Sequence, residues 1–412
     1  MRRALVLLAA CGGARAAPDA ACVTSISGVV YAPNGTLPLW NVAVYVPAHD
    51  PGPFTDGVTC GRCALAGDPR AAIATDEHGH FTLANAPAGD GIPLVITTGK
   101  WRRQITVPHV EVCRDTPLDP ALTRLPRVRG EGDIPRIAIS TGVGDALECL
   151  VRKLGISDLE ITTDAQGGRV QLYSDRQAAG QGADRFAADF PGGRGFFGDS
   201  AALWTDASKL LGYDLVMLSC EGAQYPATKP QVAMDAIQTY ANAGGRLYLS
   251  HWHDIWIEGA TQRPSAGQIP KAWPSLATFD ETQPALPDGS IDTVDPTTVD
   301  GAALAAWLPG PDVPLAAGTG RQTCTAVDPA RVDTFVRHGG APQMFQFTTP
   351  VDTAPDVRCG KVAFTDMHVS GDSTSTIPVP FPGGCATTEL TPQEKVLAFM
   401  LFDLGSCLGD LL

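Results

Sequence analysis

The sequence predicts a chain of two domains, an N-terminal all-β sandwich followed by a larger C-terminal α/β domain. Short runs rich in β-branched and aromatic residues, separated by turn signals, fill residues 23–117 and are typical of a sandwich. In residues 135–412, apolar strand-like runs alternate with stretches of helical spacing. That alternation indicates a mostly parallel sheet with helices on both faces. Residues 118–134 are rich in Pro, Arg and Gly and are expected to form the linker.

Residues 1–22 are expected to be an export signal and a tether. A basic start is followed by the short apolar run Ala4–Ala10, as in signal peptides. Leu8-Ala9-Ala10-Cys11 resembles a bacterial lipobox, in which the cysteine is lipidated and holds the chain at a membrane surface. We therefore expect an exported lipoprotein of the periplasm or outer membrane, with Cys11 as the lipidation site and the membrane as a partner. The alternative is a secreted protein cleaved after Ala16 or Ala17.

The charge balance excludes one class of partner. The chain has 44 acidic and 30 basic residues, a net charge of -14 at pH 7. A nucleic-acid-binding protein needs a basic stripe to displace counterions from phosphates, and the sequence has none. No nucleic acid is expected as a partner, and the acidic balance indicates a well-solvated surface.

The cysteines agree with export. Besides Cys11 the chain has an even set spread along its length, which in an oxidising compartment is typical of disulfides. Cys22 and Cys113 bracket the first domain and can join its ends. Cys60 and Cys63 form a CxxC motif without a strand-to-helix context and without a second CxxC to complete a zinc set. We expect a local disulfide between them.

The first domain carries a family resemblance. Its expected strands are Ile26–Tyr31, Asn41–Val46, His80–Leu83, Pro93–Thr98 and Trp101–Val107. Asn34-Gly35 and the segment Asp76–Gly79 are turn signals between them. The order of Ser27–Val30, Leu39–Val44 and Thr75–Leu83 resembles the carboxypeptidase regulatory-like, or transthyretin-like, β-sandwich. This resemblance implies an accessory module without an active site, so its turn histidines are expected to be solvated.

The second domain is expected to contain at least five strands and three helices. The strands are Arg136–Thr141, Leu159–Thr163, Asp214–Ser219, Arg246–Ser250 and Gly360–Thr365. The helices are Asp145–Leu154, Lys229–Ala243 and a last one from Thr391 to about Leu404. Thr391-Pro-Gln-Glu394 has the pattern of a capping box at the start of that last helix.

Three segments of the second domain resemble the class I glutamine amidotransferase-like fold, in particular its trehalose-utilisation (ThuA-like) branch. They are Tyr213–Leu218, Tyr240–His251 and Gly360–His368, with insertions expected near residues 164–200 and 252–340. The resemblance implies a flavodoxin-like domain. The amidotransferases place a nucleophilic cysteine after the strand that here ends at Ser250, and this chain has His251 there. Cys220 follows the preceding strand, so amidotransferase chemistry is not expected.

Ligands of open α/β sheets bind beyond the carboxyl ends of the strands, and several polar residues are expected there. The candidate ligand-binding residues are Thr141, Cys220, Glu221, Trp252 and Asp254. The candidate catalytic residues are His251, His368 and Asp366. His251 and His253 would point to the same side of a strand and, with His368, can share a metal such as zinc.

Three functions remain open on the sequence alone. The first is a cell-envelope lipoprotein that binds a small molecule or glycan without turnover. The second is an exported hydrolase that uses His251, His253 and His368, with zinc or without a cofactor. The third is a structural or adhesion protein with no active site. A nucleophilic pair of Cys220 and His251 with Glu221 is feasible in geometry, but an even set of cysteines in an exported protein predicts that Cys220 is disulfide-bonded.

Overall fold

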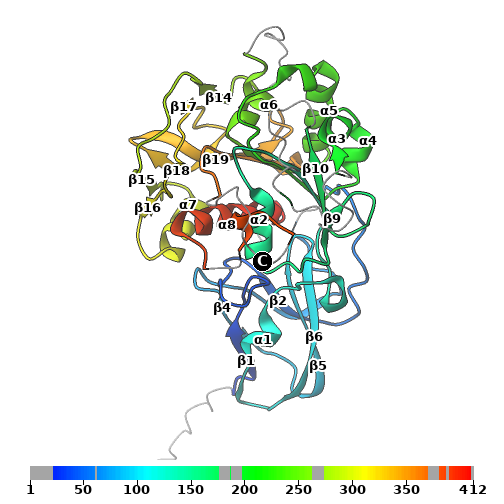
Figure 1. Cartoon of the computed structure of the whole chain (residues 1–412). Helices are drawn as coiled ribbons and strands as arrows, with labels where there is room; N and C mark the ends of the chain where they lie inside the picture. Colours follow the sequence, from blue (N-terminus) through cyan, green and yellow to red (C-terminus); the bar gives the residue numbers. More distant parts are fainter. Residues whose placement is uncertain are drawn as a thin grey trace, which may run out of the picture.

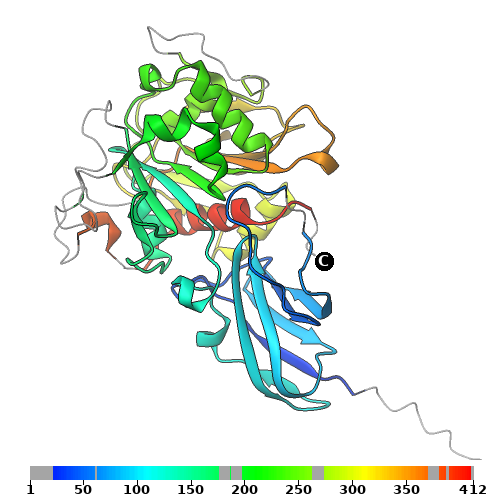
Figure 2. The same cartoon turned by 90° about the vertical axis from the view of Figure 1, so that its right-hand side faces the viewer.

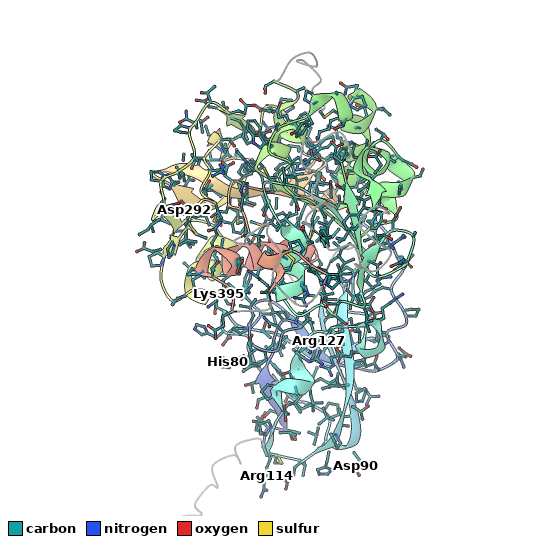
Figure 3. All side chains as sticks on the ribbon, in the orientation of Figure 1. His80, Asp90, Arg114, Arg127, Asp292 and Lys395 are labelled. Atoms are coloured by element: carbon teal, nitrogen blue, oxygen red, sulfur yellow. A yellow bond between two sulfur atoms is a disulfide. The ribbon has the colours of Figure 1, made fainter. Side chains whose placement is uncertain are left out.

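Two sheets facing each other make up the N-terminal part of the computed structural model (Figure 1). Their strand orders are β4-β1-β7 and β3-β2-β5-β6. The bounds are β1 Ser25–Val29, β2 Ala43–Pro47, β3 Pro69–Ala74, β4 His80–Ala84, β5 Gly89–Thr98, β6 Trp101–Val110 and β7 Asp115–Pro117. Strands β3 and β7 were not expected, since half of the residues of β3 are alanine and β7 has only three residues. His80 lies exposed on this part, and Asp90 and Arg114 lie at its tip (Figure 3).

The structure describes residues 22–60, 63–175, 186, 197–261, 273–369, 380–386 and 389–409. The expected lipidation site Cys11 lies outside these residues. Among the described helices, none is both long and apolar enough to cross a membrane.

The segment expected to be a linker is packed against the sandwich. It contains α1 (Pro120–Thr123) and the 3-10 helix η1 (Arg129–Glu131). The hydroxyl of Thr123 donates a hydrogen bond of 2.5 Å to the carbonyl oxygen of Val29 in β1. Arg124 forms a bidentate pair with Glu131, at 2.7 and 2.5 Å, and this pair lowers the pKa of Glu131 to about 2.

The C-terminal part is built on one mixed sheet of eleven strands, so the expectation of a mostly parallel sheet is only partly right. The parallel strands are β8 Ile137–Thr141, β9 Ile161–Thr163, β10 Val170–Ser174, β11 Gly198–Asp199, β12 Leu215–Leu218, β13 Arg246–Ser250 and β20 Gly360–Thr365. An antiparallel extension beyond β20 contains β19 Ala341–Thr349, β18 Asp333–His338, β15 Ile291–Val294 and β16 Asp312–Pro314. Strands β14 (Ala277–Phe279) and β17 (Cys324–Val327) form a separate pair. Strands β15, β16 and β18 from the expected insertion at 252–340 therefore extend the sheet.

Helices cover both faces of the parallel strands (Figure 2). One face carries α2 (Leu147–Lys153) and α8 (Pro392–Gly405), and the other carries α3 (Ser200–Trp204), α4 (Ala207–Leu211) and α5 (Gln231–Asn242). The remaining helices are η4 Pro226–Thr228, η5 His251–Asp254, α6 Ile255–Glu258, α7 Val299–Trp307, η6 Pro355–Val357 and η7 Gly383–Cys385. The capping box of α8 is confirmed, because Thr391 and Glu394 exchange both hydrogen bonds.

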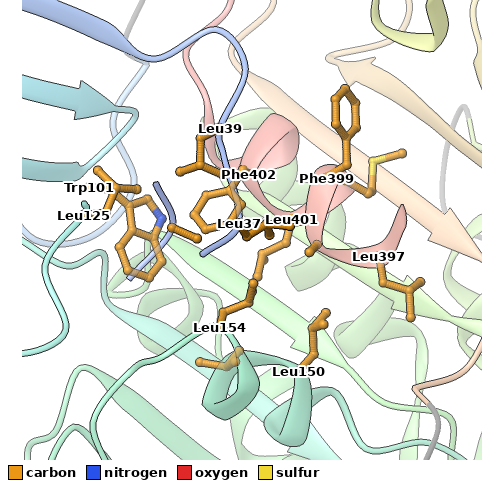
Figure 4. Packing of buried hydrophobic residues seen from close by; sticks show 14 of the residues in the cluster. Leu37, Leu39, Trp101, Leu125, Leu150, Leu154, Leu397, Phe399, Leu401 and Phe402 are labelled. Atoms are coloured by element: carbon orange, nitrogen blue, oxygen red, sulfur yellow. The ribbon is translucent and has the colours of Figure 1, made fainter. Parts of the chain in front are cut away.

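Helix α8 joins the two parts in one core. A single cluster of buried side chains runs from the sandwich through α2 and α8 to the sheet. Figure 4 shows Leu37 and Trp101 of the sandwich facing Leu154, which follows α2, and Phe402 of α8. The rings of Trp101 and Phe402 lie 5.9 Å apart. Because these residues share one apolar cluster, the two parts are expected to unfold together.

Four disulfides cross-link the described part of the chain, and two of them correct the expectation for the CxxC motif. Cys60 is bonded to Cys359 and Cys63 to Cys407, so the two cysteines of the motif do not pair with each other. The physical reason is that their loop reaches across to the C-terminal part, where the amide of Val58 donates to the carbonyl oxygen of Leu211 at 2.9 Å. The other two disulfides are Cys22–Cys113 and Cys149–Cys385.

Cys220 and Cys324 are free and buried, so the prediction of a disulfide at Cys220 is wrong.

Candidate functional site

Three metal-ligand side chains converge just beyond the carboxyl ends of neighbouring parallel strands. Cys220 follows β12, His251 follows β13 and His368 follows β20. One donor atom from each lies within 4.8 Å of the other two. The thiol of Cys220 is 3.4 Å from Nδ1 of His251, and the two imidazole rings are 5.2 Å apart. The exposed fractions of the three residues are 1%, 4% and 3%, so the cluster is buried.

His251 has a backbone conformation that is unusual for a residue with a side chain. Its φ of 44° lies in the left-handed region, at the junction where β13 ends and η5 begins. Such a conformation costs roughly 1–3 kcal/mol outside glycine and persists only where the surroundings enforce it. This turn directs the imidazole of His251 toward the thiol of Cys220.

The loop after β8 fits closely around Cys220. The amide of Gly144 donates to the carbonyl oxygen of Cys220 at 2.9 Å. A Cβ on Gly142 would lie 2.0 Å from that oxygen, so only glycine fits there. The amide of Gly222 donates to the sulfur at 3.4 Å. Burial, followed by the charges of Asp145 and Glu221, raises the pKa of the thiol to about 12. A buried, protonated thiol is a poor nucleophile, because the thiolate is the reactive form.

His368 has a ring nitrogen that makes no hydrogen bond within the described part of the chain. Its Nε2 is buried and has no hydrogen-bond partner among the described residues. Its backbone carbonyl accepts a hydrogen bond of 2.5 Å from the side chain of Gln393, which holds the residue in place. Burial, and then the charge of Arg321, lowers its pKa to about 3, so the imidazole is neutral. Leaving such an atom without a partner has a cost, which a bound metal would remove.

His253 does not belong to this cluster, so its assignment as a metal ligand is wrong. Its Nε2 donates to the carbonyl oxygen of Ser219 at 3.0 Å, and its Nδ1 accepts from the indole N–H of Trp256 at 2.9 Å. An indole N–H can only donate, which fixes this tautomer. The expectation failed because residues 251–254 form a 3-10 helix, and on a helix residues i and i+2 do not point the same way.

Asp366 and Thr141 have structural roles. The carboxylate of Asp366 accepts from the amide and the hydroxyl of Thr323, both at 2.7 Å, and from the amide of Cys324 at 3.1 Å. It therefore anchors the loop before β17, and its assignment as a catalytic residue stays a prediction. Thr141 donates to the carbonyl oxygen of Tyr173 at 2.9 Å and binds the next strand.

The remaining predicted residues lie around the cluster. Glu221 forms a buried ion pair of 2.7 Å with Lys229, and burial raises its pKa to about 7. Trp252 is half-buried, with its ring 5.0 Å from that of His251. Asp254 is buried near Glu258 and Glu281 instead of the histidines. Sequence reasoning missed both glutamates, although Glu258 lies four residues after Asp254 and could have been found by helical spacing.

A cavity of about 240 Å³ lies at the opposite edge of the sheet, between the two parts of the chain. Its charged side chains are already paired. Lys100 binds Asp214 at 2.6 Å, and Arg246 donates to the carbonyl oxygen of Cys359 at 2.7 Å. The described lining of this cavity contains no convergent set of metal-ligand side chains like the one at the carboxyl ends of the strands.

Comparisons with known proteins leave the chain unassigned to a family. No family model matches it, and no curated protein matches it. Among solved structures, it is similar to a chain in a type II cohesin–X-dockerin complex from Acetivibrio cellulolyticus, a C-terminal interface mutant. The sequence identity is 16%, the match covers 36% of this chain and 80% of that chain, and the TM-score is 0.16.

Proposed function

We propose that the protein is an exported zinc-dependent hydrolase whose metal is held by Cys220, His251 and His368. Two observations carry the proposal: one donor atom each of the buried residues Cys220, His251 and His368 lies within 4.8 Å of the other two, and the Nε2 of His368 has no partner among the described residues. Catalytic zinc sites use three protein ligands and leave one position for water. Zinc lowers the pKa of that water to about 7, which makes it a nucleophile near neutral pH.

The distances suit zinc without large movements. Zinc lies about 2.3 Å from a cysteine sulfur and about 2.0–2.1 Å from a histidine nitrogen, so tetrahedral ligands S and N stand about 3.6 Å apart. The observed distance from Cys220 Sγ to His251 Nδ1 is 3.4 Å. The neutral imidazoles are ready to bind, and the metal replaces the thiol proton.

The strand order supports a flavodoxin-like assignment for this domain. The parallel strands β10-β8-β12-β13-β20 follow the order 2-1-3-4-5, in which ligands bind at the carboxyl ends of the strands. We extend the proposal to a ThuA-like domain in which the amidotransferase nucleophile has been replaced by a metal ligand, His251. Four disulfides support export to an oxidising compartment, and the lipid anchor at Cys11 remains part of the proposal.

A second candidate function is the binding of a glycan without turnover. It is favoured by the half-buried Trp252, whose ring lies beside that of His251. Aromatic faces are suitable contacts for the apolar face of a sugar ring.

Metal analysis of the purified protein tests the first proposal. After zinc loading and desalting, we expect stoichiometric zinc in the wild type, a loss in Cys220→Ser and His368→Gln, and full retention in His80→Gln, a matched change of an exposed histidine. The cobalt-substituted protein should show thiolate-to-metal absorption that Cys220→Ser abolishes. Wild-type protein without stoichiometric zinc would overturn the site. Zinc binding without zinc-dependent cleavage of ester, phosphoester and glycoside substrates would overturn hydrolysis and favour the glycan-binding function.

A further inference from the structure

A second cluster of ligand atoms lies near the first and consists only of carboxylates. Asp254 ends η5, Glu258 ends α6, and Glu281 follows β14. One carboxylate oxygen from each residue lies within 4.8 Å of the other two. Asp254 and Glu258 are four residues apart on consecutive helices, and the fold adds Glu281 from a separate segment, so three like charges lie together. Such an arrangement is unfavourable unless protons or a cation compensate for it.

The protein supplies these carboxylates with very few hydrogen-bond donors. The side-chain nitrogen of Gln224 is 3.0 Å from Asp254, 3.3 Å from Glu258 and 3.2 Å from Glu281. An amide nitrogen carries two hydrogens, so it cannot satisfy three acceptors at once. The oxygen of the same amide accepts from the backbone amide of Thr261 at 3.1 Å, which fixes this orientation. The Thr261 hydroxyl lies 2.8 Å from Glu281 and 3.0 Å from the Gln224 oxygen, and its one proton serves only one of these two acceptors.

The unpartnered carboxylate oxygen of Asp254 is a second, independent observation that points to a bound ligand. The residue is fully buried, and its Oδ2 has no hydrogen-bond partner in the described part of the chain. Its carboxylate faces the cluster, since it is one of the three donors that converge. No lysine or arginine among the described residues forms a salt bridge with Asp254, Glu258 or Glu281. A buried carboxylate oxygen without a partner is costly and is rarely left so.

We propose that Asp254, Glu258 and Glu281 bind a divalent hard cation, with Ca²⁺ as the first candidate. Oxygen ligands bind Ca²⁺ at about 2.3–2.6 Å, so oxygens on opposite sides of one ion stand up to about 5 Å apart. The observed spread of at most 4.8 Å falls within that span. Mg²⁺ gives up its waters reluctantly and is usually bound through one or two carboxylates, so a set of three carboxylates favours Ca²⁺. Glu258 and Glu281 are half-exposed and give the ion an entry path.

The cation has a clear structural consequence. It joins the end of η5 and α6 to the segment after β14, and η5 begins with His251. The carboxylate site would therefore stiffen the turn that aims His251 at Cys220. The two sites are chemically separate, because one offers sulfur and nitrogen and the other offers only oxygen.

Terbium luminescence of the full chain tests this proposal. Tb³⁺ occupies Ca²⁺ sites, and Trp256 lies two residues before Glu258 on α6 and can sensitise its emission. We expect saturable emission that Ca²⁺ displaces, and a thermal unfolding temperature that rises with Ca²⁺ concentration. In Glu281→Gln the affinity should fall by at least about tenfold, since even outer partners of metal sites change affinity by that much. The matched control, Asp312→Asn on β16, alters an exposed carboxylate outside the cluster and should bind like the wild type.

The competing explanation is a proton shared among the carboxylates, since burial raises the pKa of Glu258 to about 10. This explanation predicts no terbium emission and no change of the unfolding temperature with Ca²⁺. It also predicts that Glu258→Gln is as stable as the wild type. These results together would overturn the proposal. Emission unchanged in both Glu258→Gln and Glu281→Gln would overturn it as well. Cys220→Ser separates this test from that of the zinc site, because it removes a zinc ligand and should leave the terbium response intact.

Discussion

The disulfide Cys63–Cys407 is expected to contribute several kcal/mol to stability, and the arrangement of the other disulfides sets the amount. The perturbation is the double change Cys63→Ala and Cys407→Ala. The two cysteines are 344 residues apart in sequence. An isolated cross-link of that length would lower the entropy of the unfolded chain by an amount worth about 6 kcal/mol. The neighbouring Cys60–Cys359 bond changes this estimate because it already ties the same segments together.

The loop that matters runs from Cys63 to Cys60, across the bond to Cys359, and on to Cys407. It contains about 50 residues, and closing it is worth about 4 kcal/mol in the chain-entropy model. We therefore expect the double variant to lose about 4 kcal/mol of unfolding free energy while it keeps the native fold. The same change should also free the loop that contains the CxxC motif from the end of α8.

Urea denaturation under oxidising conditions, followed by tryptophan fluorescence, measures this loss. Peptide mapping without reductant should show fragments in which Cys60 is joined to Cys359 in both proteins. A loss below about 1 kcal/mol would refute the reasoning, since it would mean that the unfolded chain is not constrained by this bond. A fragment in which Cys60 is joined to Cys63 would refute the pairing itself.

Two further predictions concern the loop around Cys220 and the segment that precedes β8. Gly142→Ala should lower the free energy of unfolding by about 1–3 kcal/mol, because its Cβ would lie 2.0 Å from the carbonyl oxygen of Cys220. Urea denaturation measures this loss against the control Gly130→Ala, where a Cβ meets nothing within 4 Å. Equal losses in the two variants would contradict the prediction. Hydrogen bonds from Arg124 lower the pKa of Glu131 to about 2, so its stabilising contribution is complete above its ordinary value of 4.5 and is lost as the pH falls toward about 2. The stability difference between wild type and Glu131→Gln should therefore shrink over that range, and a difference independent of pH would count against this origin.

The sequence predicted best the elements whose pattern depends on burial or capping. The strands at Arg246–Ser250 and Gly360–Thr365 have the bounds that were expected, because strands covered on both faces are continuous apolar runs. The end of the sheet beyond β20 was missed. Strand β19 contains Pro342 and Gln343, which weaken the strand pattern, although Gly339-Gly340 before it is a recognisable hairpin turn.

The candidate site was predicted in outline because strand ends in a parallel sheet share one edge. That argument placed Cys220, His251 and His368 on the same side of the domain. It could not show that η5 begins at His251 and turns His253 toward Trp256. Nor could it find Glu281, which lies in a stretch without periodicity and reaches Asp254 only through the tertiary fold.

The pairing of the CxxC cysteines with distant partners also sets an order of events during biosynthesis. A growing chain presents Cys60 and Cys63 long before Cys359 and Cys407 have been made. Until then, the nearest oxidation product for either thiol is a bond to its own neighbour in the motif. The cell must therefore keep this pair reduced, or reopen a premature bond by thiol–disulfide exchange, before the two long-range disulfides can form.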